Sequence, residues 1–363
     1  MVKKSCIVFL CLLGMNASLF SQNVIYNVGL HSFFDNNEFE ECPVKESQTM
    51  AGVHAVPQIG LEWNTKHRIF IGVDAMHEFG SNNKVDYWDP IAYYEFAGDF
   101  FRFYMGAFPR KLALDNYPLF FFQDSIRNYR PTMTGMYWEY TSAKEDFMNV
   151  WLDWTSRQTF SVRETFFMGL SGRYNWKSFY GQNYSYVHHF ACSQDPDAYT
   201  PVCDNVRIWT ALGADLSSKT SFDNLDINIG WAAGLDRDRW SNNGWLSSHG
   251  ILSQLKVEYR GLGLHNTFYR GDAQGKLYND SPQIYWDDPL YRTNFYNRLD
   301  GYIYFIKTNV VQLKLCYSLH FIKEGMFHQQ QFYASFDLDN LKKKQPGKNY
   351  RYFWDNWFTK KNL

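Results

Sequence analysis

The feature that most constrains the fold of this chain is a recurrent segment of about ten residues in which every second side chain is apolar. In residues 225–233, Leu, Ile, Ile, Trp and Ala alternate with Asp, Asn, Gly and Ala. Residues 311–321 repeat the pattern, with Gln, Lys, Cys, Ser and His on the second face. A period of two predicts β-strands, because successive strand side chains point to opposite faces. The apolar face can point to the core of a soluble sandwich or to the lipid around a membrane barrel.

The N-terminus has the pattern of a secretory signal peptide, which we place at residues 1–22. Lys3 and Lys4 precede the apolar residues 7–13, and small and polar residues follow at 16–18 and 21–22. A lipoprotein signal is the alternative, but no small residue directly precedes Cys11. No later run reaches the roughly 18 uncharged apolar residues of a membrane helix. We therefore expect an exported protein, either soluble or a barrel.

The composition favours the barrel. The chain contains 31 Phe, 26 Tyr and 13 Trp, or 19% aromatic residues, although its mean hydropathy is only −0.44. Aromatic girdles around a polar lumen produce this combination. We therefore predict the bacterial outer membrane as the location, with its lipid and lipopolysaccharide as surroundings. A net charge of −1 gives no bias towards polyanions, and nucleic acid is not an expected partner.

The spacing of the strands predicts an all-β, transmembrane, antiparallel up-and-down barrel of about 16 strands over residues 23–338. The first predicted strand covers residues 24–33, and the last covers residues 326–338. Short links such as residues 307–309 alternate with long ones such as 271–293, and the longest connection spans 109–131. This alternation is typical of periplasmic turns and extracellular loops.

Residues 339–363 form a basic and aromatic C-terminal tail. A lysine-rich linker at 342–348 is followed by the aromatic residues 350–358. One interpretation is a disordered tail, and the other is an extra element that packs against the periplasmic mouth. The sequence leaves both open.

Charged side chains on the polar face of the strands are candidates for the lumen, since a charge facing mid-bilayer lipid costs about 2–4 kcal/mol for Arg or Lys. They could pair across the lumen as an interior salt-bridge network, or they could form a constriction that contacts solutes. The candidates are Arg102, Glu139, Asp153, Arg163, Asp226, Lys256, Arg298 and Asp300.

A second group of candidates is predicted for the loops at the pore mouth. Acidic, basic and Trp side chains there can bind sugars by ring stacking and bidentate hydrogen bonds, and they can equally fold a loop onto itself. These candidates are Arg157, Asp236, Arg237, Asp238, Arg239 and Trp240.

Four cysteines follow the predicted signal peptide, and two of them suggest a disulfide. Cys192 and Cys203 flank a turn-rich segment, and the oxidising exterior favours their pairing. Two free thiols are the alternative. Metal binding is disfavoured, because no C-x-x-C spacing is present.

Enzyme signatures are weak. The G-x-S-x-G, H-E-x-x-H and P-loop motifs are absent from the sequence. His188, His189, Ser193 and Asp195 lie close together at a strand end, which keeps a barrel hydrolase open as an alternative. We expect no enzyme activity, no cofactor and no metal.

The chain resembles porin-like outer-membrane barrel proteins of Bacteroidota bacteria. The resemblance rests on the signal ending in Ser-Gln, the aromatic hairpins, residues 106–111 (Gly-Ala-Phe-Pro-Arg-Lys) and residues 153–155 (Asp-Trp-Thr). It implies a passive channel for small polar solutes or sugars. A structural or surface-binding barrel and a barrel hydrolase are the alternatives. The oligomeric state and the solute cannot be predicted.

Overall fold

The chain forms a closed barrel of sixteen strands, in which each strand pairs with its neighbours in sequence and β1 pairs with β16. All pairs are antiparallel, and Leu30 on β1 lies opposite Phe336 on β16 where the barrel closes. The computed structural model describes residues 22–195, 198, 200–341 and 352–355. The predicted fold class and strand number are confirmed.

The order of the strands around the barrel is their order along the chain. The strands are β1 (Gln22–Glu38), β2 (Gln48–Trp63), β3 (His67–Glu78), β4 (Tyr87–Ala97), β5 (Phe101–Pro109), β6 (Thr132–Thr141), β7 (Phe147–Ser156), β8 (Thr165–Trp176), β9 (Phe179–Phe190), β10 (Cys203–Asp215), β11 (Asn224–Asp238), β12 (Leu246–Tyr259), β13 (Leu262–Gly271), β14 (Phe295–Lys307), β15 (Val311–Ile322) and β16 (Gly325–Asp339). The connections contain the helices α2 (Lys111–Leu114) and α3 (Asp124–Tyr129), and the 3₁₀ turns η2 (Ser217–Lys219), η3 (Pro282–Ile284) and η4 (Pro289–Arg292). None of the described helices is long and apolar enough to cross a membrane.

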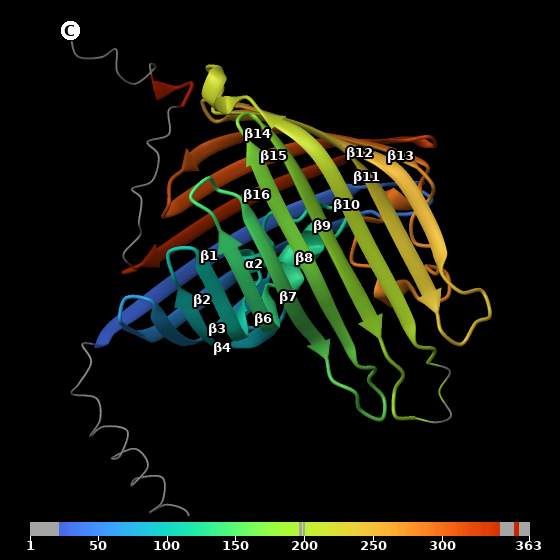
Figure 1. Cartoon of the computed structure of the whole chain (residues 1–363), viewed down its shortest axis with the longest axis horizontal. Helices are drawn as coiled ribbons and strands as arrows, with labels where there is room; N and C mark the ends of the chain where they lie inside the picture. The colour runs from blue at the N-terminus through green and yellow to red at the C-terminus, as the bar shows by residue number, and fades with distance from the viewer. Residues whose placement is uncertain (1–21, 196–197, 199, 342–351, 356–363) are drawn as a thin grey trace, which may run out of the picture.

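The two ends of the barrel carry connections of different length. Short turns, such as residues 64–66 and 260–261, lie at the end where the chain enters β1 and leaves β16. The other end carries the longest loops, residues 110–131, 191–202 and 272–294. In Figure 1 the chain enters β1 and leaves β16 on the left, and several long loops extend at the lower right. We assign the long-loop end to the extracellular side, because outer-membrane barrels have short periplasmic turns.

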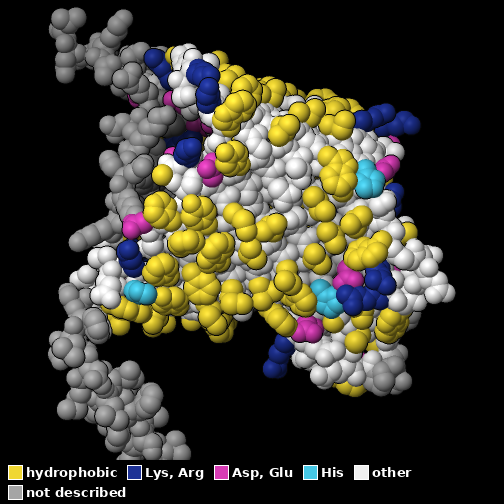
Figure 2. All heavy atoms as spheres, viewed as in Figure 1, with side chains coloured by type: hydrophobic (Ala, Val, Ile, Leu, Met, Phe, Trp, Pro, Cys, Tyr) yellow, Lys and Arg dark blue, Asp and Glu magenta, His cyan; other side chains and the backbone are white. Residues whose placement is uncertain are grey.

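The outer wall is apolar and the inner wall is largely polar or aromatic. Ile59, Ile71 and Ile229 are each more than half exposed on the outside. Figure 2 shows apolar side chains spread over the wall, with most charged groups near its ends. A water-soluble protein seldom exposes so large an apolar surface, whereas lipid covers it at no cost.

Two extracellular loops fold into the barrel and fill the extracellular part of the lumen. Residues 110–131 bury Phe120 and Phe121 completely, and residues 272–294 bury Leu290 and Tyr291 completely. The loops are joined by backbone hydrogen bonds, from Gln123 to the Trp286 carbonyl at 2.8 Å and from Asp288 to the Leu119 carbonyl at 3.1 Å. Figure 1 shows α2 inside the barrel, behind β7 and β8. The extracellular part of the lumen is therefore packed with loop side chains.

The predicted segments outside the barrel are described only in part. Residues 1–21 of the predicted signal peptide lie outside the described residues, and Gln22 begins β1. In the C-terminal tail, residues 352–355 are described. Phe353 donates its N–H to the Arg260 carbonyl at 3.0 Å, and Trp354 stacks on Phe305. These four residues lie against the periplasmic turns, and the two interpretations of the whole tail stay predictions.

Candidate functional site

Most of the predicted lumen residues face the interior, where they form ion pairs. Arg102 lies 4.0 Å from Glu139, and Asp226 accepts a hydrogen bond from the Tyr180 hydroxyl at 2.6 Å. Lys256 lines the interior cavity, and no carboxylate of the described residues lies within ion-pair distance of it.

Arg298 is the centre of a buried network. Its Nε donates to Asp300 at 2.6 Å, and its Nη1 donates to Asp124 of α3 at 3.2 Å. Its Nη2 donates to Ser318 and Gln331, both at 3.4 Å. Burial raises the pKa of Asp124, but the charges of Arg298 and Arg127 outweigh it and hold that pKa below its ordinary value. The network therefore fixes α3 to the barrel wall as an ion pair.

Asp153 fixes the other end of the same loop. Its carboxylate accepts a hydrogen bond from Arg110 Nη2 at 2.7 Å, and both side chains are buried. Arg110 also donates through Nε to the Arg130 carbonyl at 2.7 Å. These contacts join the first and last residues of the lumen loop, so they hold its two ends together at β7.

Two of the sequence-based placements need correction. Arg163 was expected on a strand, but β8 begins only at Thr165. The Arg163 guanidinium donates to the carbonyl of Phe190 at the end of β9 and to that of Ala191 in the following loop. Asp236 was expected in a mouth loop, but β11 continues to Asp238, and Asp236 is fully buried. It accepts a hydrogen bond from Asn205 at 2.6 Å, so alternation along the longer strand turns it inward.

The remaining mouth candidates lie at the extracellular rim. Arg157 and Trp240 are exposed, and Arg237 and Asp238 lie at the end of β11. The Arg237 guanidinium lies 5.7 Å from the Trp245 ring, and the Trp240 N–H donates to Asp238. These contacts join residues of the same connection.

The predicted disulfide is not formed: Cys192 and Cys203 are free cysteines in the structure. The reason is that Cys203 does not lie in the loop but is the first residue of β10. Its side chain is fully buried with Leu277, Ile284 and Tyr285, and its Sγ lies 3.6 Å from the Ser281 hydroxyl. Cys192 stays in the loop, where its carbonyl accepts a hydrogen bond from Gln158.

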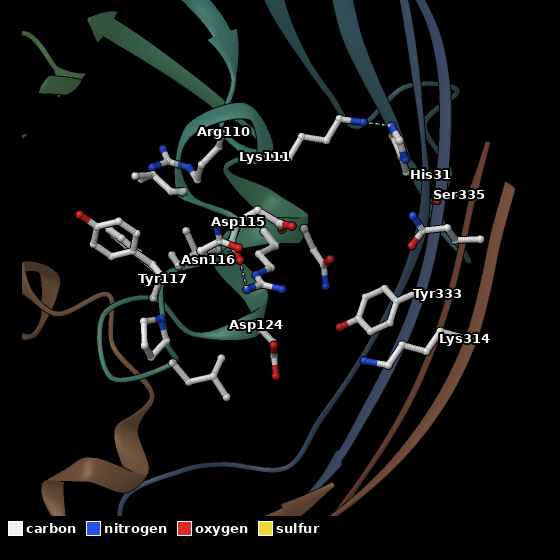
Figure 3. Close-up of a pocket in the computed structure, with 18 of the residues that line it drawn as sticks. His31, Arg110, Lys111, Asp115, Asn116, Tyr117, Asp124, Lys314, Tyr333 and Ser335 are labelled. Carbon is white, nitrogen blue, oxygen red and sulfur yellow. Dashed lines mark hydrogen bonds between the residues drawn. The ribbon is translucent and has the colours of Figure 1, made fainter. Parts of the chain in front are cut away.

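A large cavity remains in the periplasmic part of the lumen. Its volume is about 1030 Å³, and residues 109–112 and 114–119 form part of its boundary. Asp215, Asn224 and Gln312, at the periplasmic ends of three strands, also line it, whereas no residue of 272–294 does. The cavity therefore faces the periplasm and is covered on its extracellular side by the lumen loop. Figure 3 shows Lys111 extending from the lumen loop towards His31, which lies on the barrel wall on the same side as Tyr333 and Lys314.

Two lumen histidines have both ring nitrogens occupied. His54 Nδ1 lies 2.6 Å from Asp74 Oδ1, and His54 Nε2 lies 2.8 Å from the Asn128 carbonyl oxygen. His320 is bonded to Tyr296 and Gln329 in the same way. Neither imidazole has a nitrogen left to accept a proton from a substrate.

His189 differs because it faces the lipid at the extracellular end of β9. Its Nδ1 lies 2.8 Å from Asp204 Oδ1 on β10. Asp204 is buried and also accepts two hydrogen bonds from Arg239, at 2.7 and 3.0 Å. No hydrogen bond to His189 Nε2 occurs among the described residues. A carboxylate thus orients the imidazole and leaves Nε2 able to act as a base.

His189 belongs to a continuous row on the outer wall. The register pairs Trp154 with Phe166, Phe166 with His189, His189 with Asp204, and Asp204 with Arg237. The rings of Trp154 and Phe166 lie 5.1 Å apart, and those of Phe166 and His189 lie 5.0 Å apart. We call Trp154, Phe166, His189, Asp204 and Arg237 the outer row; it places the His189–Asp204 pair beside aromatic side chains on the outer wall.

Sequence reasoning grouped His189 with the wrong neighbours. His188 points into the lumen, where Nδ1 contacts the Ile284 carbonyl, because successive residues of a strand face opposite sides. Ser193 hydrogen-bonds to Thr200 within its own loop. The missed residue is Asp204, which parity would have placed on the outer face had β10 been started at Cys203.

The comparisons with known proteins bear on this arrangement. A family model described as lipid A 3'-O-deacylase-type matches residues 17–344. The chain belongs to the lipid A 3'-O-deacylase-type family. The expectation that the protein is not an enzyme is therefore wrong, because this is an enzyme family. No curated protein matches the chain in sequence.

Solved structures similar to this deacylase-type barrel are outer-membrane proteins. A loop-deletion mutant of OmpT from Vibrio cholerae superposes with a TM-score of 0.53 at 9% identity, covering 88% of this chain and all of that one. An anion-selective porin from Comamonas acidovorans gives 0.52 at 9% identity with the same coverage. At this identity the likeness shows the fold alone. Outer-membrane location is confirmed, and the resemblance to Bacteroidota proteins stays a prediction.

Proposed function

We propose that the protein is an outer-membrane hydrolase that removes an ester-linked acyl chain from lipid A, with His189 as the general base. The family supplies the reaction class. The observation that carries the proposal is the lipid-facing imidazole of His189, oriented by Asp204 and free at Nε2. Asp204 acts through His189 and is a positioning residue.

The depth of the outer row suits an ester substrate. Aromatic girdles lie at the boundary between the polar headgroups and the hydrocarbon core. The ester bonds of a lipid lie at the same boundary, between sugar and acyl chain. A lipid A molecule in the outer leaflet would therefore bring its esters to the level of His189, with Trp154 and Phe166 beside the chain.

The proposed reaction is hydrolysis by an activated water. His189 Nε2 takes one proton from the water, and the resulting hydroxide oxygen bonds to the ester carbonyl carbon. The bond from that carbon to the sugar oxygen then breaks, and the sugar oxygen receives the proton from the imidazolium. The products are a fatty acid and a free sugar hydroxyl. Asp204 favours the imidazolium that forms between the two steps.

The cations around the pair favour an anionic lipid. Hydrogen bonds from Arg239 hold Asp204 in place, and the Asp204 carboxylate raises the pKa of the Arg239 guanidinium. Arg237 lies opposite Asp204 in the register and turns to the same outer face. Guanidinium groups bind phosphate well, so Arg237 is suited to a lipid A phosphate.

The passive channel predicted from the sequence receives less support from the geometry. The inner wall is charged, as in a channel, but the loops 110–131 and 272–294 bury Phe120 and Tyr291 completely within the lumen. Those side chains occupy the space that a solute would need. A structural barrel without activity would leave the His189–Asp204 pair without a role.

Purified protein incubated with lipid A in detergent micelles tests the proposal. We expect release of free fatty acid and a lipid A product that has lost one ester-linked chain, both measured by mass spectrometry. Phosphatidylethanolamine in the same micelles is the control, because its headgroup offers a single phosphate and no sugar. Lipid A that stays intact, or both lipids deacylated at equal rates, would contradict the proposed substrate.

A further inference from the structure

The periplasmic cavity has the size and position of a ligand site. Its volume of about 1030 Å³ lies at the upper end of the range of about 300–1,000 Å³ that small-molecule pockets occupy. It lies behind the lumen loop, on the inner side of the wall that carries the outer row. It therefore plays no part in the proposed deacylation.

Most of the cations that line this cavity are already bonded. Arg110 pairs with Asp153, and Arg298 pairs with Asp300 and Asp124. Lys111 donates to Asp337 at 2.7 Å, Arg173 lies 4.0 Å from Asp226, and Arg127 donates to the Asp115 carbonyl at 3.2 Å. These groups have a structural use that leaves little of their charge for a ligand.

Lys256 and Lys314 are different. Neither has a carboxylate within 4.0 Å among the described residues, although both line the cavity. The nearby carboxylates are occupied: Tyr180 and Arg173 bond to Asp226, and Lys307 bonds to Glu258. Repulsion from Lys307 and Lys314 acts on Lys256, beside a larger attraction from Glu258 and a smaller one from Asp226. An anion placed in the cavity would relieve that repulsion.

Neutral polar groups complete the lining around the two lysines. Lys314 Nζ lies 4.5 Å from the Tyr302 ring, and Figure 3 shows Lys314 and Tyr333 on the barrel wall facing the lumen loop. Gln254, Gln312 and Asn228 also line the cavity. Hydroxyl, amide and ammonium groups together suit a ligand with several hydroxyls and one anionic group.

We propose that the periplasmic cavity binds a small polyhydroxylated anion, a sugar acid or sugar phosphate, through Lys256 and Lys314. The shared chemistry is an oxyanion on a hydroxylated ring. The two forms differ in the anionic group, and the test separates them.

Isothermal titration of the full-length protein in detergent with glucuronate, glucose 6-phosphate and glucose tests this site. We expect at least one of the anions to bind and glucose to bind more weakly. Glucuronate alone would indicate a carboxylate site, and glucose 6-phosphate alone a phosphate site. The proposal would be overturned if glucose bound as tightly as the anions, or if neither anion bound.

The variant carrying Lys256→Met and Lys314→Met should weaken anion binding by about 10- to 100-fold, because each charge-assisted hydrogen bond contributes to affinity. Lys219→Met, at an exposed periplasmic turn outside the cavity, is the matched control and should bind as the wild type does. Unheated gel mobility identifies folded barrels, and Lys314→Gln is a milder variant if the double variant does not fold. Wild-type affinity in a folded lysine variant would overturn the proposal, whether or not the protein deacylates lipid A.

Discussion

His189→Gln is expected to lower the rate of fatty-acid release from lipid A by about 10²- to 10⁴-fold, the usual contribution of a general base. Glutamine keeps a polar tip of similar size, but it cannot accept a proton from water. Asp204 and Arg239 would still hold each other, since their hydrogen bonds do not involve the imidazole. Initial rates of fatty-acid release at saturating lipid A measure the effect, which should fall mainly on kcat.

His249→Gln is the matched control for this prediction. His249 also faces outward, stacked on Trp231 with the ring centroids 5.5 Å apart, and no ion pair to its side chain occurs among the described residues. Its replacement should leave the rate close to that of the wild type. Equal losses in both variants would indicate a general effect on the outer wall, and an unchanged rate in His189→Gln would exclude His189 as the base.

Arg298→Met is expected to destabilise the barrel by about 3–5 kcal/mol, the cost of breaking a buried ion pair by removing one partner. Asp300 and Asp124 would each lose their hydrogen bond from the guanidinium while staying near the inner wall. The lumen loop would also lose its attachment at α3. Urea unfolding of the variant in detergent, followed by tryptophan fluorescence, measures the change in free energy of unfolding.

Arg102→Met serves as the comparison for a solvated pair. Arg102 lies 4.0 Å from Glu139, and its side chain is half exposed. Pairs of this kind contribute about 0–1 kcal/mol to stability, so the variant should unfold at nearly the same urea concentration as the wild type. If Arg298→Met needed as much urea to unfold as Arg102→Met does, the buried network would not be what holds the loop in the lumen.

Much of the barrel could be predicted because period-two alternation is a local property. The alternation within each strand indicates which of its residues face the lipid, as in residues 225–233. The alternation of short and long loops indicates the antiparallel order of the strands. Strand ends were harder to place, because a lipid-facing pattern fades at the polar rim. The errors at Arg163, Cys203 and Asp236 all have this origin: β8 begins only at Thr165, β10 already includes Cys203, and β11 continues to Asp238.

The candidate site was predictable only in part. His189 was noticed, but its partner Asp204 lies on the next strand, and only the register brings the two together. The filling of the lumen was not predicted either. Residues 117–122 contain as many aromatic side chains as a typical strand of this barrel. Nothing in their spacing shows that Phe120 and Phe121 pack inside the barrel rather than cover its rim.

Mass spectrometry of lipid A from cells that produce the wild type, His189→Gln or His249→Gln tests the central claim most directly. The account predicts lipid A lighter by one ester-linked acyl chain with the wild type and with His249→Gln. It predicts fully acylated lipid A with His189→Gln, at equal amounts of folded protein in the outer membrane. Lipid A that keeps all its chains in the presence of the wild type, or that loses one in the presence of His189→Gln, would contradict the account.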